Sequence, residues 1–315
     1  MLSVGSLCTG YGGLEMAVES VFGSTNLRFV SDIDKDVTKL LAHHHPNVPN
    51  LGDLIKVKWE DVEPVDVLCA GYPCQPFSTA GKRKGLEDER AIFEYIADAI
   101  SVLRPRYLLL ENVAGHLTLG GTAVINTLTK LGYNSRWGIV RASDTGAPHQ
   151  RKRLFIWSQP ANTSSERSPR LSKKRPDRFN ASIPNRPPTQ PRHVAASNSA
   201  FVTDTDGRGL QIVRTQSGLG ETFEESCPVG FFGPYEPAIR RWAQIIGRSV
   251  PIPVDDRGVE PVFVEWMMGL PEGHVTGLGL SRTAELRILG NGVVPQQAAL
   301  AINLLTERGE NATPA

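Results

Sequence analysis

The chain has 315 residues, of which 40% are hydrophobic and 21% are charged, and its formal net charge is +1. This composition is typical of a soluble globular protein and excludes a chain that is disordered throughout, while the length suits two domains or one large domain with an insertion. The nearly balanced charge does not by itself indicate a nucleic-acid partner, although a balanced total can still contain a basic face.

Residues 1–158 alternate between short apolar runs and stretches with helical spacing. Strands are predicted at residues 2–7, 27–31, 66–70, 107–110 and 154–157, and helices at residues 14–22, 34–44 and 92–103. The apolar runs within 66–70 and 107–110 are typical of strands that are buried on both faces. Strands that alternate with helices over this length predict an α/β fold with a mostly parallel sheet and right-handed crossovers.

The sequence changes character after residue 158. Residues 163–193 are rich in Pro, Ser, Arg and Lys, which predicts a linker or surface loop, with a phosphate-contacting arm as the alternative. Residues 200–260 have many Gly and Pro and few periodic stretches, which indicates a small irregular module. Apolar density returns at residue 262. We therefore predict domains at residues 1–158 and 159–261, and a segment at 262–315 that returns to the first domain.

The turn after the first predicted strand is rich in glycine and is followed by an acidic residue. Gly10, Gly12 and Gly13 lie in the segment CTGYGG, and Asp32 ends the second predicted strand. Such a turn lets a ligand approach the backbone closely, and an acid about 20 residues later can accept hydrogen bonds from a ribose. The pair indicates a cofactor that contains adenosine, although many α/β folds use the same turn for packing alone.

Cys74 follows a buried strand in the segment GYPCQPFS. Prolines 73 and 76 flank it and restrict the shape of the loop. Open α/β sheets bind ligands at the carboxyl ends of their strands, which is where this loop begins. A buried structural thiol is the alternative, and it suits Cys69, inside the strand, better than Cys74.

Two further predicted strands deliver charged residues to the same edge of the sheet. Glu111 ends the apolar run of residues 107–110, and a helix cap or loop anchor is its alternative role. Arg151 and Arg153 precede the apolar segment LFIW, and they share one face if the strand begins at residue 151. Lys152, between them, is expected to be solvated.

Neither the cysteines nor the histidines have the spacing of a metal site. The four cysteines are Cys8, Cys69, Cys74 and Cys227, and we expect reduced thiols. Residues 43–45 are a run of histidines, but adjacent helical residues point in different directions. We predict no metal. The sequence has no recognisable signal peptide and no run of 18 apolar residues, so we expect a cytoplasmic protein without a membrane span.

The ordered blocks CTGYGG, GYPCQPFS, ENV, QRKR and GNGVVP together resemble the cytosine-5 DNA methyltransferase family of bacteria and phages. The resemblance covers about two-thirds of the chain. It implies the Rossmann-like fold of S-adenosylmethionine-dependent methyltransferases, with helices on both faces of the sheet, plus a small irregular target-recognition domain in the middle segment.

The resemblance also implies a mechanism and site residues. Cys74 would add to C6 of a cytosine that has been flipped out of the DNA duplex, and Glu111 would assist at N3 with a pKa raised by burial. Arg151 and Arg153 would hold the base edge and the catalytic loop. Residues 79–90 would close on the phosphates as a mobile basic loop, and a plain surface loop is the alternative.

S-adenosyl-L-methionine is the cofactor that the resemblance implies. Its contacts are assigned to Cys8, Gly10, Gly12, Gly13, Leu14, Asp32, Ile33, Asp53, Pro73 and Asn291. The chain departs from the family pattern at Cys8, where phenylalanine is usual, and at Ile33, where an aromatic residue is frequent. Asp32 replaces the commoner glutamate, and Gly292 replaces a small polar residue.

Double-stranded DNA is the expected substrate and partner. The alternatives are an RNA substrate on the same fold, a catalytically silent DNA-binding protein and a dinucleotide oxidoreductase. The roughly 100 residues between QRKR and VFVEW favour a DNA-reading module, and the intact catalytic set disfavours a silent protein. We expect a monomer, and either a separate cognate restriction endonuclease or phage self-protection would fit.

Overall fold

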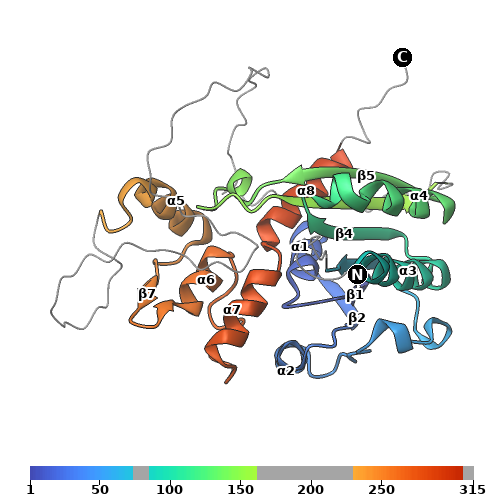
Figure 1. Ribbon diagram of the computed structural model, residues 1–315, viewed down its shortest axis with the longest axis horizontal. Coiled ribbons are helices and arrows are strands. Elements are labelled where there is room, and N and C mark those ends of the chain that lie inside the picture. Colours follow the sequence, from blue (N-terminus) through green and yellow to red (C-terminus); the bar gives the residue numbers. More distant parts are fainter. Residues whose placement is uncertain (74–84, 162–229, 308–315) are drawn as a thin grey trace, which may run out of the picture.

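The computed structural model describes residues 1–73, 85–161 and 230–307. Its centre is a six-stranded sheet in the order β2-β1-β3-β4-β6-β5 (Figure 1). The strands are β1 (Leu2–Leu7), β2 (Thr25–Phe29), β3 (Val67–Gly71), β4 (Tyr107–Val113), β5 (Tyr133–Val140) and β6 (Arg153–Pro160). Strands β1 to β4 pair in parallel, whereas β6 runs antiparallel to both β4 and β5. The carboxyl ends of β1 to β4 therefore meet at one edge, where β6 begins.

Helices cover both faces of this sheet. They are α1 (Gly13–Phe22), α2 (Lys35–His44), α3 (Gly85–Leu103), α4 (Thr122–Lys130), α5 (Glu236–Ile246), α6 (Pro261–Met267), α7 (Arg282–Asn291) and α8 (Pro295–Glu307). Residues of α3 and α4 share one apolar cluster with the sheet, and residues of α1 and α8 share another on the opposite face. The predicted three-layer α/β fold is confirmed.

A further apolar cluster joins α2, α5, α6 and α7 beyond the sheet. Trp242 and Trp266 lie fully buried in it, and the indole Nε1 of Trp242 donates to the carbonyl oxygen of Trp266 at 3.0 Å. Tyr11, in the glycine turn between β1 and α1, belongs to the same cluster. The cluster therefore reaches the carboxyl edge of the sheet, and α5 to α7 lie together on one side of the sheet in Figure 1.

Several elements differ from those that the sequence predicts. Strand β2 begins two residues earlier than predicted, and α2 begins after Asp34, whose carboxylate caps it by accepting from the amides of Asp36 and Val37. Strand β5 and helix α4 were not predicted, because only the two end residues of β5 and two residues of α4 are buried, so neither forms a long apolar pattern. Helix α5 lies within residues 200–260, where the Gly- and Pro-rich composition predicts little regular structure.

Candidate active site

Glu111 and Arg153 form a buried ion pair at the carboxyl edge of the sheet. Glu111 lies near the end of β4 and Arg153 is the first residue of the antiparallel β6, with Arg153 Nε 2.8 Å from Glu111 Oε1. Each residue is only 9% exposed. Burial raises the pKa of the Glu111 carboxyl, and it outweighs the opposing effects of Arg153 and Arg151. A carboxyl in this position is favoured to hold a proton at a higher pH than an exposed glutamate.

The chain leaves β3 directly beside Glu111. Gly71 and Glu111 are register partners, and a Cβ on Gly71 would lie 3.6 Å from Glu111 Oε2. Cys74 follows three residues later in the sequence and lies outside the described residues, as do residues 79–84 of the predicted basic loop. Residues 85–90 belong to helix α3, so the loop predicted at 79–90 is wrong over its second half. The start of the cysteine loop therefore lies beside the Glu111 carboxylate. The position of the Cys74 thiol stays a prediction.

Tyr72 and His116 tie the start of the cysteine loop to the segment after β4. The Tyr72 hydroxyl and His116 Nε2 are hydrogen-bonded at 3.0 Å, and both residues are buried. The Asn112 amide Nδ2 also donates to the carbonyl oxygen of Tyr72, at 3.3 Å. Burial lowers the pKa of His116, which favours the neutral ring. Sequence reasoning missed this pair, although the motif ENV did lead to the adjacent Asn112.

Arg151 does not share a strand face with Arg153, because β6 begins only at residue 153 and Arg151 has a φ of 32°. Its guanidinium donates to the carbonyl oxygens of Gly290, at 2.7 Å, and Gly292. Burial, followed by the charge of Arg153, lowers the pKa of Arg151 to about 10. The structure thus places Arg151 on the turn between α7 and α8. Lys152 is exposed, as predicted.

The glycine turn between β1 and α1 has the features of an anion-binding turn. Gly10 and Gly12 have φ values of 58° and 85°, and a Cβ on Gly10 would meet nothing within 4 Å. The N-cap residue of α1 is Gly12, which has no side chain to cap the helix, and Glu15 is the acidic residue of the first turn. Asp32 Oδ2 accepts from the Gly10 amide at 3.0 Å. Burial raises the pKa of Asp32.

Asn50 brings the two predicted adenosine-binding acids together. Its Oδ1 accepts from the amides of Asp32 and Gly52, each at 3.0 Å, and Asp53 follows directly. Asp53 caps the short helix η1 (Leu54–Lys56) through the Ile55 amide at 3.1 Å, which leaves further lone pairs on its carboxylate. Asn50 was not predicted, because only the folded chain places it beside Asp32.

The remaining predicted cofactor residues differ in exposure. Ile33 is 74% exposed beside Asp32, and Pro73 and Asn291 are also exposed. Leu14 is buried against the sheet. Cys8 is half-buried, and burial, followed by the charge of Asp32, raises the pKa of its thiol to about 12. An open glycine turn, two nearby carboxylates and an exposed apolar side chain suit a cofactor with a carboxylate, a ribose and an adenine.

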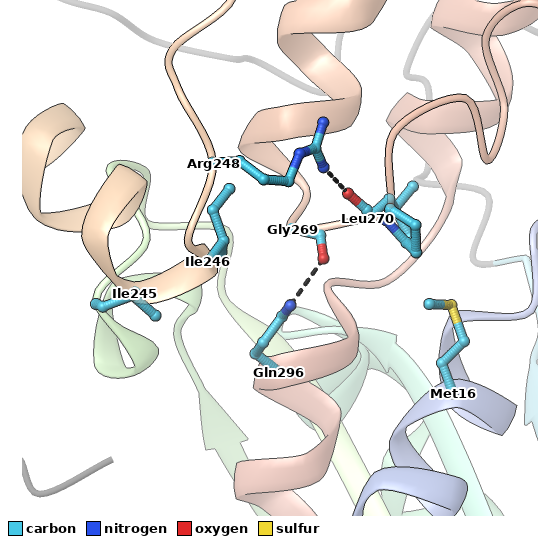
Figure 2. Close-up of a pocket in the computed structure, with 8 residues that line it drawn as sticks. Met16, Ile245, Ile246, Arg248, Gly269, Leu270 and Gln296 are labelled. Atoms are coloured by element: carbon cyan, nitrogen blue, oxygen red, sulfur yellow. Dashed lines mark hydrogen bonds between the residues drawn. The ribbon is translucent and has the colours of Figure 1, made fainter. Parts of the chain in front are cut away.

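A separate cavity of 380 Å³ lies between α1, the end of α5 and the N-terminus of α8 (Figure 2). Met16, Ile245, Ile246 and Leu270 give it apolar walls. The Gln296 amide donates across it to the Gly269 carbonyl at 2.7 Å, and Arg248 donates to the carbonyl of Leu270 (Figure 2). None of the predicted site residues that the structure describes lines this cavity.

Within the part of the chain that the structure describes, no group of three or more His, Cys, Asp or Glu residues is arranged to hold a metal ion. Of the histidine run, His44 uses Nε2 to donate to the carbonyl of His274 at 2.6 Å. One described stretch, Arg282–Thr306, is long and apolar enough to resemble a membrane span, but 56% of its apolar 18-residue window is buried inside the protein and the stretch comprises α7 and α8. That burial is typical of core helices.

The model of the C-5 cytosine-specific DNA methylase family matches residues 2–211, which is well over half of the chain. The chain belongs to this family. Among curated relatives, it is 34% identical over 156 residues to the type II methyltransferase M.NlaIV of Neisseria lactamica, over 46% of this chain and 37% of that protein. It is 37% identical over 155 residues to M.NgoBI of Neisseria gonorrhoeae, over 48% of each chain. The matches thus span less than half the length of these relatives.

Solved structures share the fold along nearly the whole chain. The Dnmt2 methyltransferase of S. pombe superimposes with a TM-score of 0.60 at 19% identity, over 98% of this chain and 99% of that one. The methyltransferase EhMeth of Entamoeba histolytica gives a TM-score of 0.56 at 14% identity, over 98% of each chain. At these identities the likeness supports the fold, which agrees with the sheet order described above.

Proposed function

We propose that the chain is a DNA (cytosine-5-)-methyltransferase that methylates cytosine within a specific short sequence of double-stranded DNA. The observation that carries this proposal is the buried pair of Glu111 and Arg153 beside Gly71, where the segment GYPCQPFS begins. Membership of the cytosine-specific family adds the reaction class. The edge of the sheet would then combine a proton-holding carboxyl, a fixed cation and a nucleophilic thiol.

Cys74 is the proposed nucleophile. A free thiol with a pKa of about 8.5 is only a few per cent thiolate at neutral pH, so the site must raise that fraction or remove the proton during attack. Addition of the thiolate to C6 of cytosine makes C5 nucleophilic, and a proton held by Glu111 at N3 makes C6 more electrophilic. The raised pKa of Glu111 supports this role, and Arg153 would fix the carboxyl's orientation. Attack of C5 on the donated methyl group would release S-adenosylhomocysteine, and transfer of the C5 proton to a base or water with elimination of the Cys74 thiolate would then give 5-methylcytosine.

S-adenosyl-L-methionine would supply the electrophilic methyl group when bound. The glycine turn with the uncapped start of α1 would hold its carboxylate, Asp32 its ribose and Asp53 its adenine. Ile33 would cover the adenine as an exposed apolar side chain. Cys8, whose raised pKa keeps the thiol neutral, adds no charge to this pocket.

The target cytosine must leave the duplex before Cys74 can reach it, at a cost of a few kcal/mol. We propose that residues 159–261 read the target sequence and that residues 262–315 return to the catalytic domain. We further propose a monomeric, cytoplasmic enzyme, acting beside a separate restriction endonuclease or in phage self-protection. Within this region the basic and polar residues Arg208, Gln211, Arg214 and Gln216 are candidates for reading the bases, with a surface loop as the alternative, and they lie outside the described residues.

The direct test is transfer of a labelled methyl group from S-adenosylmethionine to duplex DNA, with transfer RNA as the competing substrate and Cys74→Ala as the control. We expect labelled 5-methylcytosine in DNA with the native chain and none with the variant. Transfer to RNA alone would replace the proposed substrate. Appreciable transfer by Cys74→Ala would overturn the covalent mechanism.

A further inference from the structure

Tyr11 lies at the point where the glycine turn meets the turn between α7 and α8. It is 2% exposed, and its hydroxyl donates to the carbonyl oxygen of Val293 at 2.7 Å. Burial raises the pKa of this phenol, so the hydroxyl keeps its proton and can donate. One side chain thus joins two segments that are far apart in sequence and that both carry proposed cofactor contacts, Gly10 on one and Asn291 on the other.

The ring of Tyr11 occupies the space that a side chain at position 292 would need. A Cβ on Gly292 would lie 1.8 Å from Tyr11 Cε1 and 2.2 Å from Cζ, which is far inside van der Waals contact. On the other segment, a Cβ on Gly13 would lie 2.5 Å from the Val293 carbonyl oxygen and 2.9 Å from Tyr11 Cε2. The two backbones approach this closely only because positions 13 and 292 are both glycine and the tyrosine ring fills the gap between them.

The backbone of Tyr11 is held as firmly as its side chain. His274 Nε2 donates to the carbonyl oxygen of Tyr11 at 2.7 Å, and His44 Nε2 donates to the carbonyl oxygen of His274 at 2.6 Å. The two imidazole rings stack with their centroids 4.3 Å apart. On the other side, Arg151 donates to the carbonyl oxygens of the turn between α7 and α8. Each segment therefore has further contacts of its own, and the Tyr11 side chain joins the two.

We propose that Tyr11 and Gly292 form a matched pair that sets the width of the cofactor pocket, with Tyr11 acting as a positioning residue for S-adenosylmethionine. The inference rests on the proposed function, because it assigns the pocket to that cofactor. Loss of the hydroxyl frees the Val293 carbonyl inside the protein and loosens the turn that carries Asn291. A side chain at position 292 pushes the ring toward the glycine turn.

The test is calorimetric titration of the full chain with S-adenosylhomocysteine, together with thermal unfolding and steady-state kinetics. Tyr11→Phe keeps the ring and is expected to bind about tenfold more weakly, with a higher KM for S-adenosylmethionine and an unchanged kcat. Gly292→Ala is expected to bind at least tenfold more weakly than Tyr11→Phe. In Tyr11→Leu/Gly292→Ala the smaller side chain makes room for the new methyl group, so its affinity should exceed that of Gly292→Ala alone.

Gly138→Ala is the matched control for the glycine substitution. Gly138 lies on β5, where a Cβ would be in ordinary contact with Leu305 at 3.8 Å, so this variant should bind like the native chain. Native affinity in Tyr11→Phe, or a double variant no better than Gly292→Ala, would overturn the matched pair. If the native chain itself failed to bind the nucleoside, the proposed function would fall first, so the two failures are distinguishable.

Discussion

Glu15 is a buried acid whose removal should stabilise the protein at alkaline pH. It lies in the first turn of α1, and both of its carboxylate oxygens are shielded from solvent. Burial raises its pKa from the ordinary value of 4.5 to about 7, with smaller opposing effects from Ser6 and the local backbone. Ionisation of this carboxyl is therefore much less favourable in the folded protein than in the unfolded chain.

The sign of the pH effect follows from proton binding. Between pH 4.5 and pH 7 the unfolded chain loses the Glu15 proton while the folded protein keeps it, so stability falls as pH rises through this window. A shift of this size corresponds to roughly 3 kcal/mol at 1.36 kcal/mol per pKa unit. Glu15→Gln removes the ionisation, so we expect it to be more stable than the native chain by up to about 3 kcal/mol at pH 8 and by little at pH 4.5.

Urea unfolding of the native chain and Glu15→Gln at pH 4.5 and pH 8 measures this difference. Glu19→Gln is the matched control, because Glu19 lies on the same helix but is exposed. The reasoning would be refuted if Glu15→Gln differed from the native chain by the same free energy of unfolding at both pH values, or if it were less stable than the native chain at pH 8.

Three further predictions follow from the described contacts. Glu265 is fully buried and accepts four hydrogen bonds from residues 273–276. Glu265→Ala should therefore lower the free energy of unfolding in urea by about 3 kcal/mol or more, and a loss below about 1 kcal/mol would contradict this. Tyr72→Phe removes the hydrogen bond to His116 Nε2 and should lower the free energy of unfolding by about 1 kcal/mol. Tyr72→Phe/His116→Phe should cost less than the two single changes added together, and strictly additive losses would argue against the pair. Glu111→Gln should slow methyl transfer by about 10² or more while S-adenosylhomocysteine still binds, and loss of binding would make Glu111 a structural residue.

Much of the fold was predictable because its strands carry strong local signals. The central parallel strands β3 and β4 are buried on both faces, so their apolar runs stand out in the sequence. Edge strand β5 has no such signal: Trp137 and Ile139 are exposed on one side, and Gly138 lies against α8 on the other. Helix α5 was not predicted within its Gly- and Pro-rich surroundings, and only Ile239 and Trp242 of it are buried.

The site was predictable where it depends on strand ends, and less so where it depends on long-range contacts. Glu111 and Arg153 meet because adjacent strands bring them to one edge, as their positions in the sequence indicate. Arg151 and Arg153 were expected to share a face only if the strand began at residue 151, and this condition is not met because β6 begins at residue 153. The contact between Tyr11 and Gly292 joins residues that no local pattern connects, so only the folded chain reveals it.

The most direct test of the proposed function is to express the chain in a host that lacks cytosine methylation and to sequence its plasmid by a method sensitive to 5-methylcytosine. Cys74→Ala, produced to the same level, is the control. Methylation of cytosine in one fixed short context, absent from the control, is the predicted result and would also reveal the target sequence. An unmethylated plasmid recovered from cells that contain folded native protein would contradict a DNA cytosine-5 methyltransferase.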